Sequence, residues 1–115
     1  MILNLTQHPA SPEQRKSGVV EPSGKSEIKN LLTFEEPPSK NEMRTRAIKL
    51  TNMAHNQNAP KVMIGGAPFF MSSLEKTLKE KGIEPIYAFT KRVVQENPET
   101  GEKKSIFKHE GFIAV

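Results

Sequence analysis

The chain has 115 residues, a length typical of one domain with one modest hydrophobic core, and it has no cysteine, which excludes disulfides and thiolate chemistry. Its 17 Lys and Arg residues and 13 acidic residues give a net charge of +4, a mild excess without the dense basic stripe expected of a duplex DNA binder. No apolar run approaches the roughly 20 residues of a membrane span and no basic region opens the chain, so we expect a cytoplasmic protein without membrane association.

The first elements follow from apolar runs and capping residues. Ile2–Leu5 reads as a short buried strand, although Asn4 interrupts its apolar run. Ser11 is a good N-cap, and Gln14 stands three residues later, where a capping box places its partner. The predicted helix is short, because Gly18 offers a stop.

The middle of the chain is predicted to hold two extended segments and one long helix. Val19–Val20 is a candidate small strand, and Leu31–Phe34 is a second apolar run that reads as a strand. Ser39 then caps a helix with Glu42 as its capping-box partner. Apolar residues recur at helical spacing up to about Asn56, where this helix should end.

The clearest buried strand is Val62–Ile64, which Gly65 and Gly66 stop. A second long helix is predicted to begin near Ser72, with Glu75 at the capping-box position. This helix should end at Gly82.

The C-terminal part reads as a strand and its antiparallel return. Ile86–Phe89 is apolar, and an alternating pattern continues it to Gln95. Residues 97–101 have the Pro and Gly of a turn, and the returning strand should kink at Gly111. We therefore predict a single Rossmann-like α/β domain over residues 1–115, with a mostly parallel sheet and an antiparallel C-terminal hairpin. The predicted core strands are Ile2–Leu5, Leu31–Phe34, Val62–Ile64 and Ile86–Phe89.

Candidate site residues follow from one rule: open parallel sheets bind ligands outside the carboxyl ends of their strands. The first and central strands are expected to be neighbours, so Gly65, Gly66 and His8 should line one anion-accepting cleft. The residues after the strand ends are the candidates for ligand contact: Thr6, Gln7, His8, Gly65, Gly66, Ala67, Ser72, Thr90, Lys91 and Arg92.

Each candidate also has a purely structural interpretation. Gly65 and Gly66 let a ligand approach the backbone beside a helix N-terminus, but the same pair can simply turn a strand into a loop. His8 can contact phosphate or transfer a proton, or it can be an ordinary loop histidine. Lys91 and Arg92 can reach the cleft, or they can be solvated charges.

Several chemistries are excluded by missing residue types. No Walker P-loop and no GxGxxG motif occurs, so common nucleotide-cofactor sites are not expected. The three histidines are scattered and the chain has no Asp, so neither a metal site nor an Asp nucleophile is predicted. No cofactor is expected.

Two segments nevertheless resemble a known group. Asn4–Gln14 resembles the opening of small CRISPR-associated proteins, in which His-Pro and then Thr/Ser-Pro-Glu-Gln follow the first strand. Ile64–Phe69, with the helix after it and Pro85–Thr90, is similar to the central part of the CARF-related Rossmann-like domains of these proteins. The resemblance covers about half of the chain.

The resemblance implies an antiviral-defence protein that binds a cyclic oligoadenylate as a homodimer. Some members of that group are ring nucleases that cleave their ligand without a metal, the substrate's own 2′-hydroxyl attacking the adjacent phosphate. His8 would then be the candidate catalytic residue. The alternative is a non-enzymatic interaction module of phage or mobile-element origin, whose loops meet a protein partner. Binding of cyclic oligonucleotides would distinguish the two.

Overall fold

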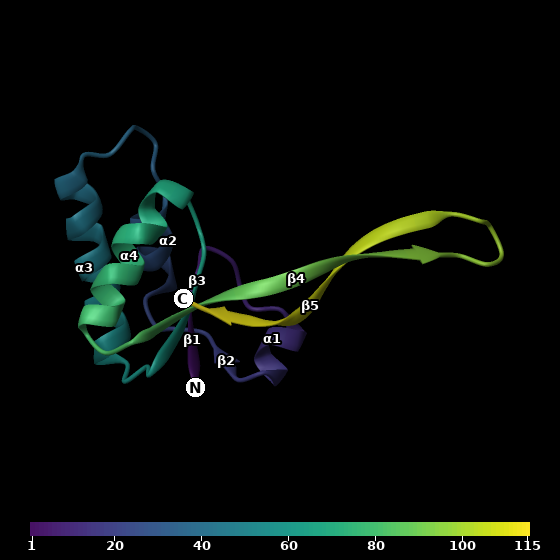
Figure 1. The fold of residues 1–115 in the computed structure, drawn as a ribbon, viewed down its shortest axis with the longest axis horizontal. Coiled ribbons are helices and arrows are strands. Elements are labelled where there is room, and N and C mark those ends of the chain that lie inside the picture. Colours follow the sequence, from purple (N-terminus) through teal and green to yellow (C-terminus); the bar gives the residue numbers. More distant parts are fainter.

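The computed structural model describes residues 1–115 (Figure 1). Five strands and four helices follow one another in the chain: β1 (Ile2–Leu5), α1 (Pro12–Lys16), β2 (Val19–Val20), α2 (Lys25–Leu32), α3 (Lys40–Asn56), β3 (Lys61–Ile64), α4 (Pro68–Glu80), β4 (Glu84–Glu96) and β5 (Lys103–Ala114). No helix combines the length and the apolar character that crossing a membrane requires.

The five strands form one sheet in the order β2-β1-β3-β4-β5. The pairs β1–β2, β1–β3 and β3–β4 are parallel, and β4–β5 is antiparallel. The predicted fold class, α/β with a mostly parallel sheet and an antiparallel C-terminal hairpin, is confirmed. The chain moves from β1 outward to β2 and then returns to the other side of β1 with β3. The strand order therefore reverses between β1 and β3.

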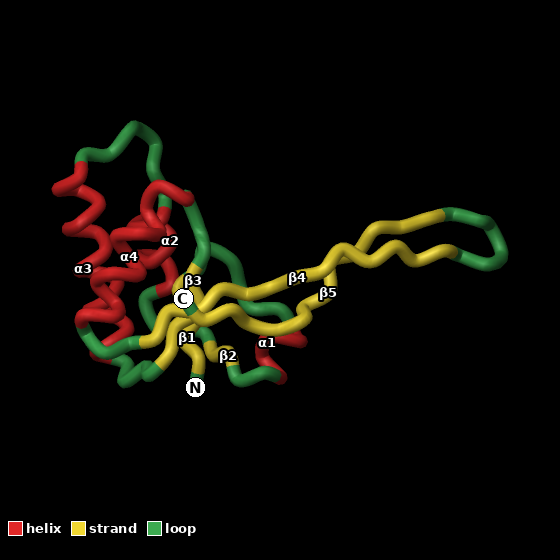
Figure 2. Tube along the Cα trace, viewed as in Figure 1, coloured by secondary structure: helices red, strands yellow, loops and turns green.

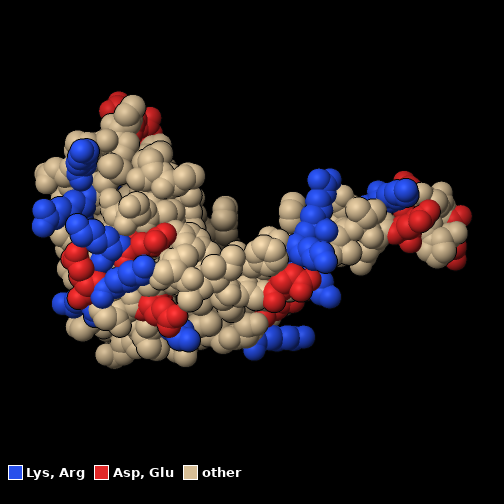
Figure 3. Space-filling model, in the orientation of Figure 1, with Lys and Arg blue, Asp and Glu red and all other residues tan.

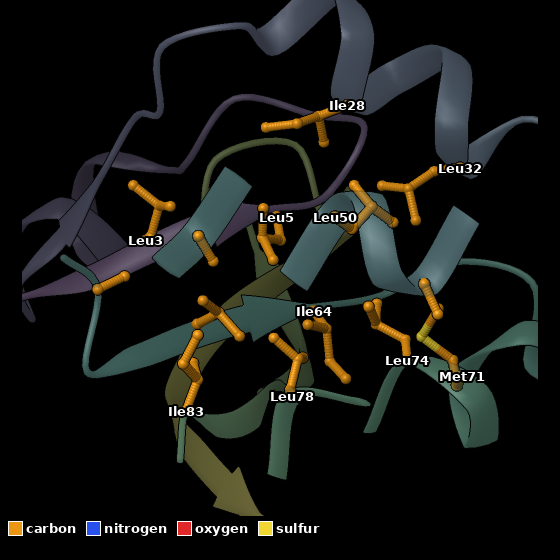
Figure 4. Close-up of a cluster of buried hydrophobic side chains, with 14 of the residues drawn as sticks. Leu3, Leu5, Ile28, Leu32, Leu50, Ile64, Met71, Leu74, Leu78 and Ile83 are labelled. Carbon is orange, nitrogen blue, oxygen red and sulfur yellow. The ribbon is translucent and has the colours of Figure 1, made fainter. Parts of the chain in front are cut away.

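Three helices cover one face of the sheet (Figure 2). Leu3 and Leu5 of β1 point toward them, as do Val62 and Ile64 of β3, because alternate residues of a strand share a face. The helices contribute Ile28 and Leu32 from α2, Leu50 from α3, and Leu74 and Leu78 from α4 (Figure 4). Ala47 and Ala54 of α3 and Phe70 of α4 belong to the same cluster. This cluster is the main hydrophobic core of the protein.

The opposite face of the sheet is covered much less. Its smaller cluster contains Ala10, Val19, Met63 and Ile86. The short helix α1 and the loop before it lie on this side (Figure 1). A capping box of Ser11 and Gln14, as predicted, holds the start of α1.

The prediction that Leu31–Phe34 is a core strand was wrong. Leu31 and Leu32 form the last turn of α2, while Thr33 and Phe34 lie in the loop that follows. The apolar residues Ile28, Leu31 and Leu32 have the i, i+3, i+4 spacing of one helix face, and this spacing decides the structure. Gly24, in a left-handed conformation, precedes the helix as its N-cap.

The predicted start of the second long helix was also wrong. Helix α4 begins at Pro68, after the N-cap Ala67, so Ser72 lies within the helix and does not cap it. Proline suits the first turn of a helix because its fixed φ is helical and the missing N–H has no partner there. The helix ends close to Gly82, as predicted, with Lys81 as its C-cap.

The hairpin of β4 and β5 extends well beyond the rest of the sheet (Figure 1). The pairing of β3 with β4 ends at Ile86, whereas β4 stays paired with β5 as far as Glu96 and Lys103. The register shifts between Phe89 and Thr90, opposite the predicted kink at Gly111. We call residues 89–111 the arm. It gives the molecule its longest dimension of 55 Å, against 32 and 25 Å.

Candidate functional site

A cleft of about 540 Å³ opens at the carboxyl ends of β1 and β3, where the strand order reverses. One wall is the loop after β1 with the start of α1, the floor is the end of β3, and the other wall is β4. The cleft is lined by Thr6, Gln7, His8, Pro9, Ser11, Gln14, Met63, Ile64, Gly65, Gly66, Tyr87 and Ala88. Five of the predicted site residues therefore share one cleft: Thr6, Gln7, His8, Gly65 and Gly66.

Asn4 holds the loop that forms the first wall. Its side chain is 0% exposed, and its Oδ1 accepts hydrogen bonds from the backbone N of Thr6 at 3.0 Å and from the Thr6 hydroxyl at 2.6 Å. Its Nδ2 donates to the backbone oxygen of His8 at 2.8 Å and to a carboxylate oxygen of Glu21 at 2.9 Å. The buried amide thus satisfies its hydrogen-bonding groups by fixing the turn after β1.

Glu21, between β2 and α2, and Lys25, the first residue of α2, complete this network. The Glu21 carboxylate accepts from the backbone N of Ala10 at 2.7 Å and lies 3.5 Å from the Lys25 ammonium. Burial alone would raise the pKa of Glu21, but the hydrogen bonds from Ala10 and Asn4 and the charge of Lys25 together lower it below its ordinary value. Burial lowers the pKa of Lys25, and the Glu21 charge offsets this only in part.

His8 is held by its backbone and leaves its ring free. Its carbonyl oxygen accepts hydrogen bonds from Asn4 and from the Lys25 ammonium, the latter at 3.0 Å. The exposed imidazole makes no hydrogen bond within the chain, so both ring nitrogens are available to a ligand. Beside it, the Gln7 amide donates to the Thr33 hydroxyl at 2.9 Å, which ties the same loop to the end of α2.

The two glycines at the end of β3 have different roles. Gly66 has a φ of 152°, and a Cβ there would lie 3.4 Å from the terminal methyl of Met71. Gly65 needs no such backbone conformation, and a Cβ there would meet only the Thr6 methyl at 3.7 Å. Gly66 is therefore required by the backbone, whereas Gly65 keeps the floor of the cleft open beside Thr6.

Tyr87 forms the wall that β4 contributes. Its hydroxyl donates a hydrogen bond to the Glu75 carboxylate of α4. Burial, the hydrogen bond to Glu75 and the negative charge of Glu75 all raise the pKa of Tyr87 well above its ordinary value. The phenol therefore remains protonated over the whole physiological range of pH.

The other predicted site residues do not line the cleft. Ala67 is the N-cap of α4 and Ser72 lies in that helix, while Thr90, Lys91 and Arg92 lie on the arm. The strand does not end at Thr90, because the alternating pattern continues in pairing with β5. No group of three or more His or Glu side chains is placed to hold a metal ion.

Sequence reasoning missed several residues that shape the cleft. Strand alternation could have predicted the place of Tyr87, because this pattern directs its side chain to the helix face, near the carboxyl end of β3. Ser11 and Gln14 were predicted only as caps, yet the same side chains form part of the wall. The pairing of Asn4 with Glu21 had no local signal, since it depends on how two separate loops fold over the sheet.

The protein is therefore an α/β domain with a ligand-sized cleft at the point where the strand order of its sheet reverses. The model of the uncharacterized protein MJ1673 family matches residues 1–113, and the chain belongs to this family. No curated protein and no solved structure matches the chain.

Proposed function

We propose that this protein binds a nucleotide-type ligand in the cleft, with cyclic oligoadenylates as the ligand class. One observation carries the proposal: Thr6, Gln7 and His8 after β1 meet Gly65 and Gly66 after β3 in a single cleft where the strand order reverses. Ligands of open α/β sheets bind at this position, because the loops of the two strands diverge there.

The size and chemistry of the cleft suit a nucleotide. Its volume of about 540 Å³ lies within the roughly 300–1,000 Å³ of small-molecule sites. The lining offers the Gln7 amide oxygen, the His8 imidazole and the backbone beside Gly65, which can meet ribose hydroxyls and base edges. No Lys or Arg lines the cleft, so His8 and backbone N–H groups would meet the phosphates.

Cleavage of such a ligand would use His8 as the residue that transfers protons. The ribose 2′-hydroxyl would attack the adjacent phosphorus and form a 2′,3′-cyclic phosphate, and the bond to the 5′-oxygen would break. Neutral His8 can accept the proton of the 2′-hydroxyl, and its cation can protonate the leaving 5′-oxygen. The Asn4 network restrains the backbone of His8, which would position the ring for either transfer.

Binding of labelled cyclic tetraadenylate tests the proposal on wild type and three variants at fixed salt. His8→Ala should weaken binding about tenfold, the value of one hydrogen bond to a charged group. Gly65→Val should abolish binding, because its side chain would fill the floor beside Thr6. His55→Ala, at the exposed end of α3, is the control and should bind like wild type.

Circular dichroism establishes that each variant is folded. Binding that survives both His8→Ala and Gly65→Val would remove the cleft as the site. If wild type binds neither cyclic tetraadenylate nor cyclic hexaadenylate, the proposed ligand class is wrong. Appearance of a 2′,3′-cyclic phosphate product in wild type and not in His8→Ala would show cleavage; its absence in wild type would restrict the function to binding.

A further inference from the structure

The two edges of the arm differ. At the β5 edge, the backbone N of His109 donates to the Glu13 carboxylate at 3.2 Å, so α1 covers this edge at the root of the arm. On the other side, β3 pairs with β4 only as far as Ile86, and the chain leaves the sheet at Gly65 and Gly66. From residue 89 to residue 96, the backbone of β4 is paired with β5 alone. The edge of β4 is therefore free along the arm, and another strand can add to it.

Alternate residues of β4 point their backbone groups toward this free edge. In antiparallel strands, pairs that exchange two hydrogen bonds alternate with pairs whose N–H and C=O groups point away from each other. Near the end of the hairpin, the backbone N of Asn97 donates across it at 2.8 Å. At the root, the backbone N of His109, opposite Thr90, points away from β4 toward α1. Both observations give the same alternation, so Thr90, Arg92 and Val94 turn their N–H and C=O groups outward.

The side chains beside this edge are basic or apolar. Residues 90–95 include Lys91 and Arg92 and no acidic residue. Val94 is 59% exposed, and Phe107, opposite Arg92 on β5, is 74% exposed. These two exposed fractions are the highest among the large apolar residues. The edge thus offers backbone hydrogen bonds, apolar contact and positive charge.

The positive charge has no counterpart within the chain. Lys91 lies directly opposite Lys108, and like charges at such positions destabilise a strand pair. None of the three ion pairs of the structure involves the arm. Figure 3 shows the basic side chains gathered along the middle of the arm. The acidic residues of the arm lie toward its ends: Glu96, Glu99, Glu102 and Glu110. An acidic side chain of a partner is therefore stabilised beside the middle of the arm.

We propose that an extended segment of a partner protein, in which acidic and apolar residues alternate, adds to the edge of β4 beside residues 90–94. Its backbone bonds to the outward groups of Thr90, Arg92 and Val94. Neighbouring side chains of paired strands share a face, so its acidic residues lie beside Lys91 and its apolar residues beside Val94. The ribbon, which is only marginally stable with two strands, gains a third.

The same features disfavour two other partners. A nucleic acid would meet the acidic end of the arm, residues 96–102, which repels phosphates. Phosphate oxygens are also acceptors, so they cannot bond to the outward carbonyl groups of the edge. A basic strand is repelled by Lys91 and Arg92, in the way that lysine on an edge strand prevents association. The edge is therefore closed to basic strands and open to an acidic one.

Hydrogen exchange of the full chain tests the addition, which does not depend on the ligand of the cleft. The probe is a heptapeptide of alternating valine and glutamate, and the control peptide alternates valine and lysine. In the free protein, the amide of Lys91 should exchange slowly because it bonds to β5, and those of Thr90, Arg92 and Val94 should exchange rapidly. The valine–glutamate peptide should slow these three amides about tenfold, and the valine–lysine peptide should leave them unchanged.

Proline substitutions test whether the backbone of β4 is used. Val94 and Ser105 form one pair of the hairpin, and their N–H groups point outward at opposite edges. Val94→Pro removes an N–H from the β4 edge and should weaken binding of the valine–glutamate peptide about tenfold. Ser105→Pro removes the equivalent N–H from the β5 edge and should bind like wild type. Slow exchange of the Lys91 amide in both variants establishes that the hairpin is intact.

A charge reversal tests the same contact without altering the backbone, and it decides the matter if a proline variant loses the hairpin. Lys91→Glu should weaken binding of the valine–glutamate peptide about tenfold and should permit binding of the valine–lysine peptide. Lys49→Glu, on the exposed side of α3, should change neither affinity. Gly65→Val, which fills the floor of the cleft, should bind the peptide like wild type.

Two results with the peptide would overturn the proposal. One is unchanged exchange of the Thr90, Arg92 and Val94 amides at millimolar peptide. The other is an equal loss of binding in Val94→Pro and Ser105→Pro. Binding of a labelled oligothymidylate that is lost in Lys91→Glu, together with no binding of the peptide, would overturn it in favour of a nucleic-acid partner.

Discussion

The side-chain amide of Asn4 donates a hydrogen bond to the backbone oxygen of His8, four residues further along the chain. A residue buried in the sheet thereby determines where the exposed imidazole at the cleft stands. The same oxygen also accepts a hydrogen bond from the Lys25 ammonium. The position of His8 is therefore set by groups from β1 and from the start of α2.

Asn4→Ala should destabilise the protein by about 2–3 kcal/mol, because it empties the buried position of the amide and removes one partner from partly buried groups of Thr6, His8 and Glu21 at once. The free energy of unfolding in urea measures this, with exposed Asn52→Ala on α3 as the control. Equal stability of the two variants would mean that the Asn4 network contributes nothing beyond an ordinary surface asparagine.

Glu21 should make stability depend on acidic pH. Its pKa is lower in the folded chain than its ordinary value of 4.5, so its contribution is present above pH 4.5 and is lost as the pH falls through the lowered pKa. Wild type should be more stable than Glu21→Gln at pH 7, and the difference should shrink toward pH 3. Urea unfolding at several pH values measures it. Glu27→Gln, which removes an exposed carboxylate without a hydrogen bond, should show no comparable change.

The two glycines of the cleft should respond differently to alanine. Gly66→Ala should cost about 1–2 kcal/mol, because its φ of 152° is rarely adopted by other residues and its Cβ would approach Met71. Gly65→Ala should change stability by less than about 0.5 kcal/mol, since it makes only an ordinary contact with Thr6. Thermal unfolding of both variants measures these losses of stability. A larger loss for Gly65→Ala than for Gly66→Ala would show that the backbone strain does not lie at Gly66.

Tyr87 is the only tyrosine, so the tyrosinate absorbance of the protein reports on this residue alone. Burial and Glu75 raise its pKa, so little tyrosinate should form in the folded protein at pH 10 to 11, whereas the chain in urea should titrate near 10.0. A group whose pKa is raised on folding loses its stabilising contribution as the pH rises above the unfolded value. Glu75→Gln should bring the native titration closer to that of the unfolded chain. An unchanged curve would argue against the Tyr87–Glu75 contact.

The sheet was largely predictable because its strands carry local patterns. Val62–Ile64 is an uninterrupted apolar run ended by glycines, and the alternation after Ile86 continues over the full length of β4. The neighbourhood of β1 and β3 followed from the topology of parallel sheets. These features depend on residues close together in the sequence.

The wrong predictions of secondary structure fell on short segments whose apolar pattern fits both a strand and a helix, or whose residues offer two helix starts. Leu31–Phe34 alone fits a buried strand, and only the additional Ile28 shows the helical spacing. At the start of α4, Ser72 offered a better N-cap than Ala67, but Pro68 and the burial of Phe70 determine the first turn.

The cleft was predictable only in part. The carboxyl-end rule selected Thr6, Gln7 and His8 together with Gly65 and Gly66. It could not select Asn4 or Glu21, whose partners come from loops that no local pattern joins. It also selected Thr90, Lys91 and Arg92, which lie on the arm and outside the cleft, because the rule assumes that a strand ends where its parallel pairing ends, and β4 continues.

The central ladder of the sheet also sets the order in which the molecule can assemble. Ile2 pairs with Lys61, so the longest pairing of β1 can form only after more than half of the chain has been synthesised. The β4–β5 hairpin joins neighbouring segments and can close in microseconds, whereas bringing β1 to β3 has to overcome the entropy of a long loop. During synthesis β1 emerges first and has only the two residues of β2 to pair with. The step that limits folding is therefore expected to be the meeting of β1 and β3, which is also the step that creates the cleft.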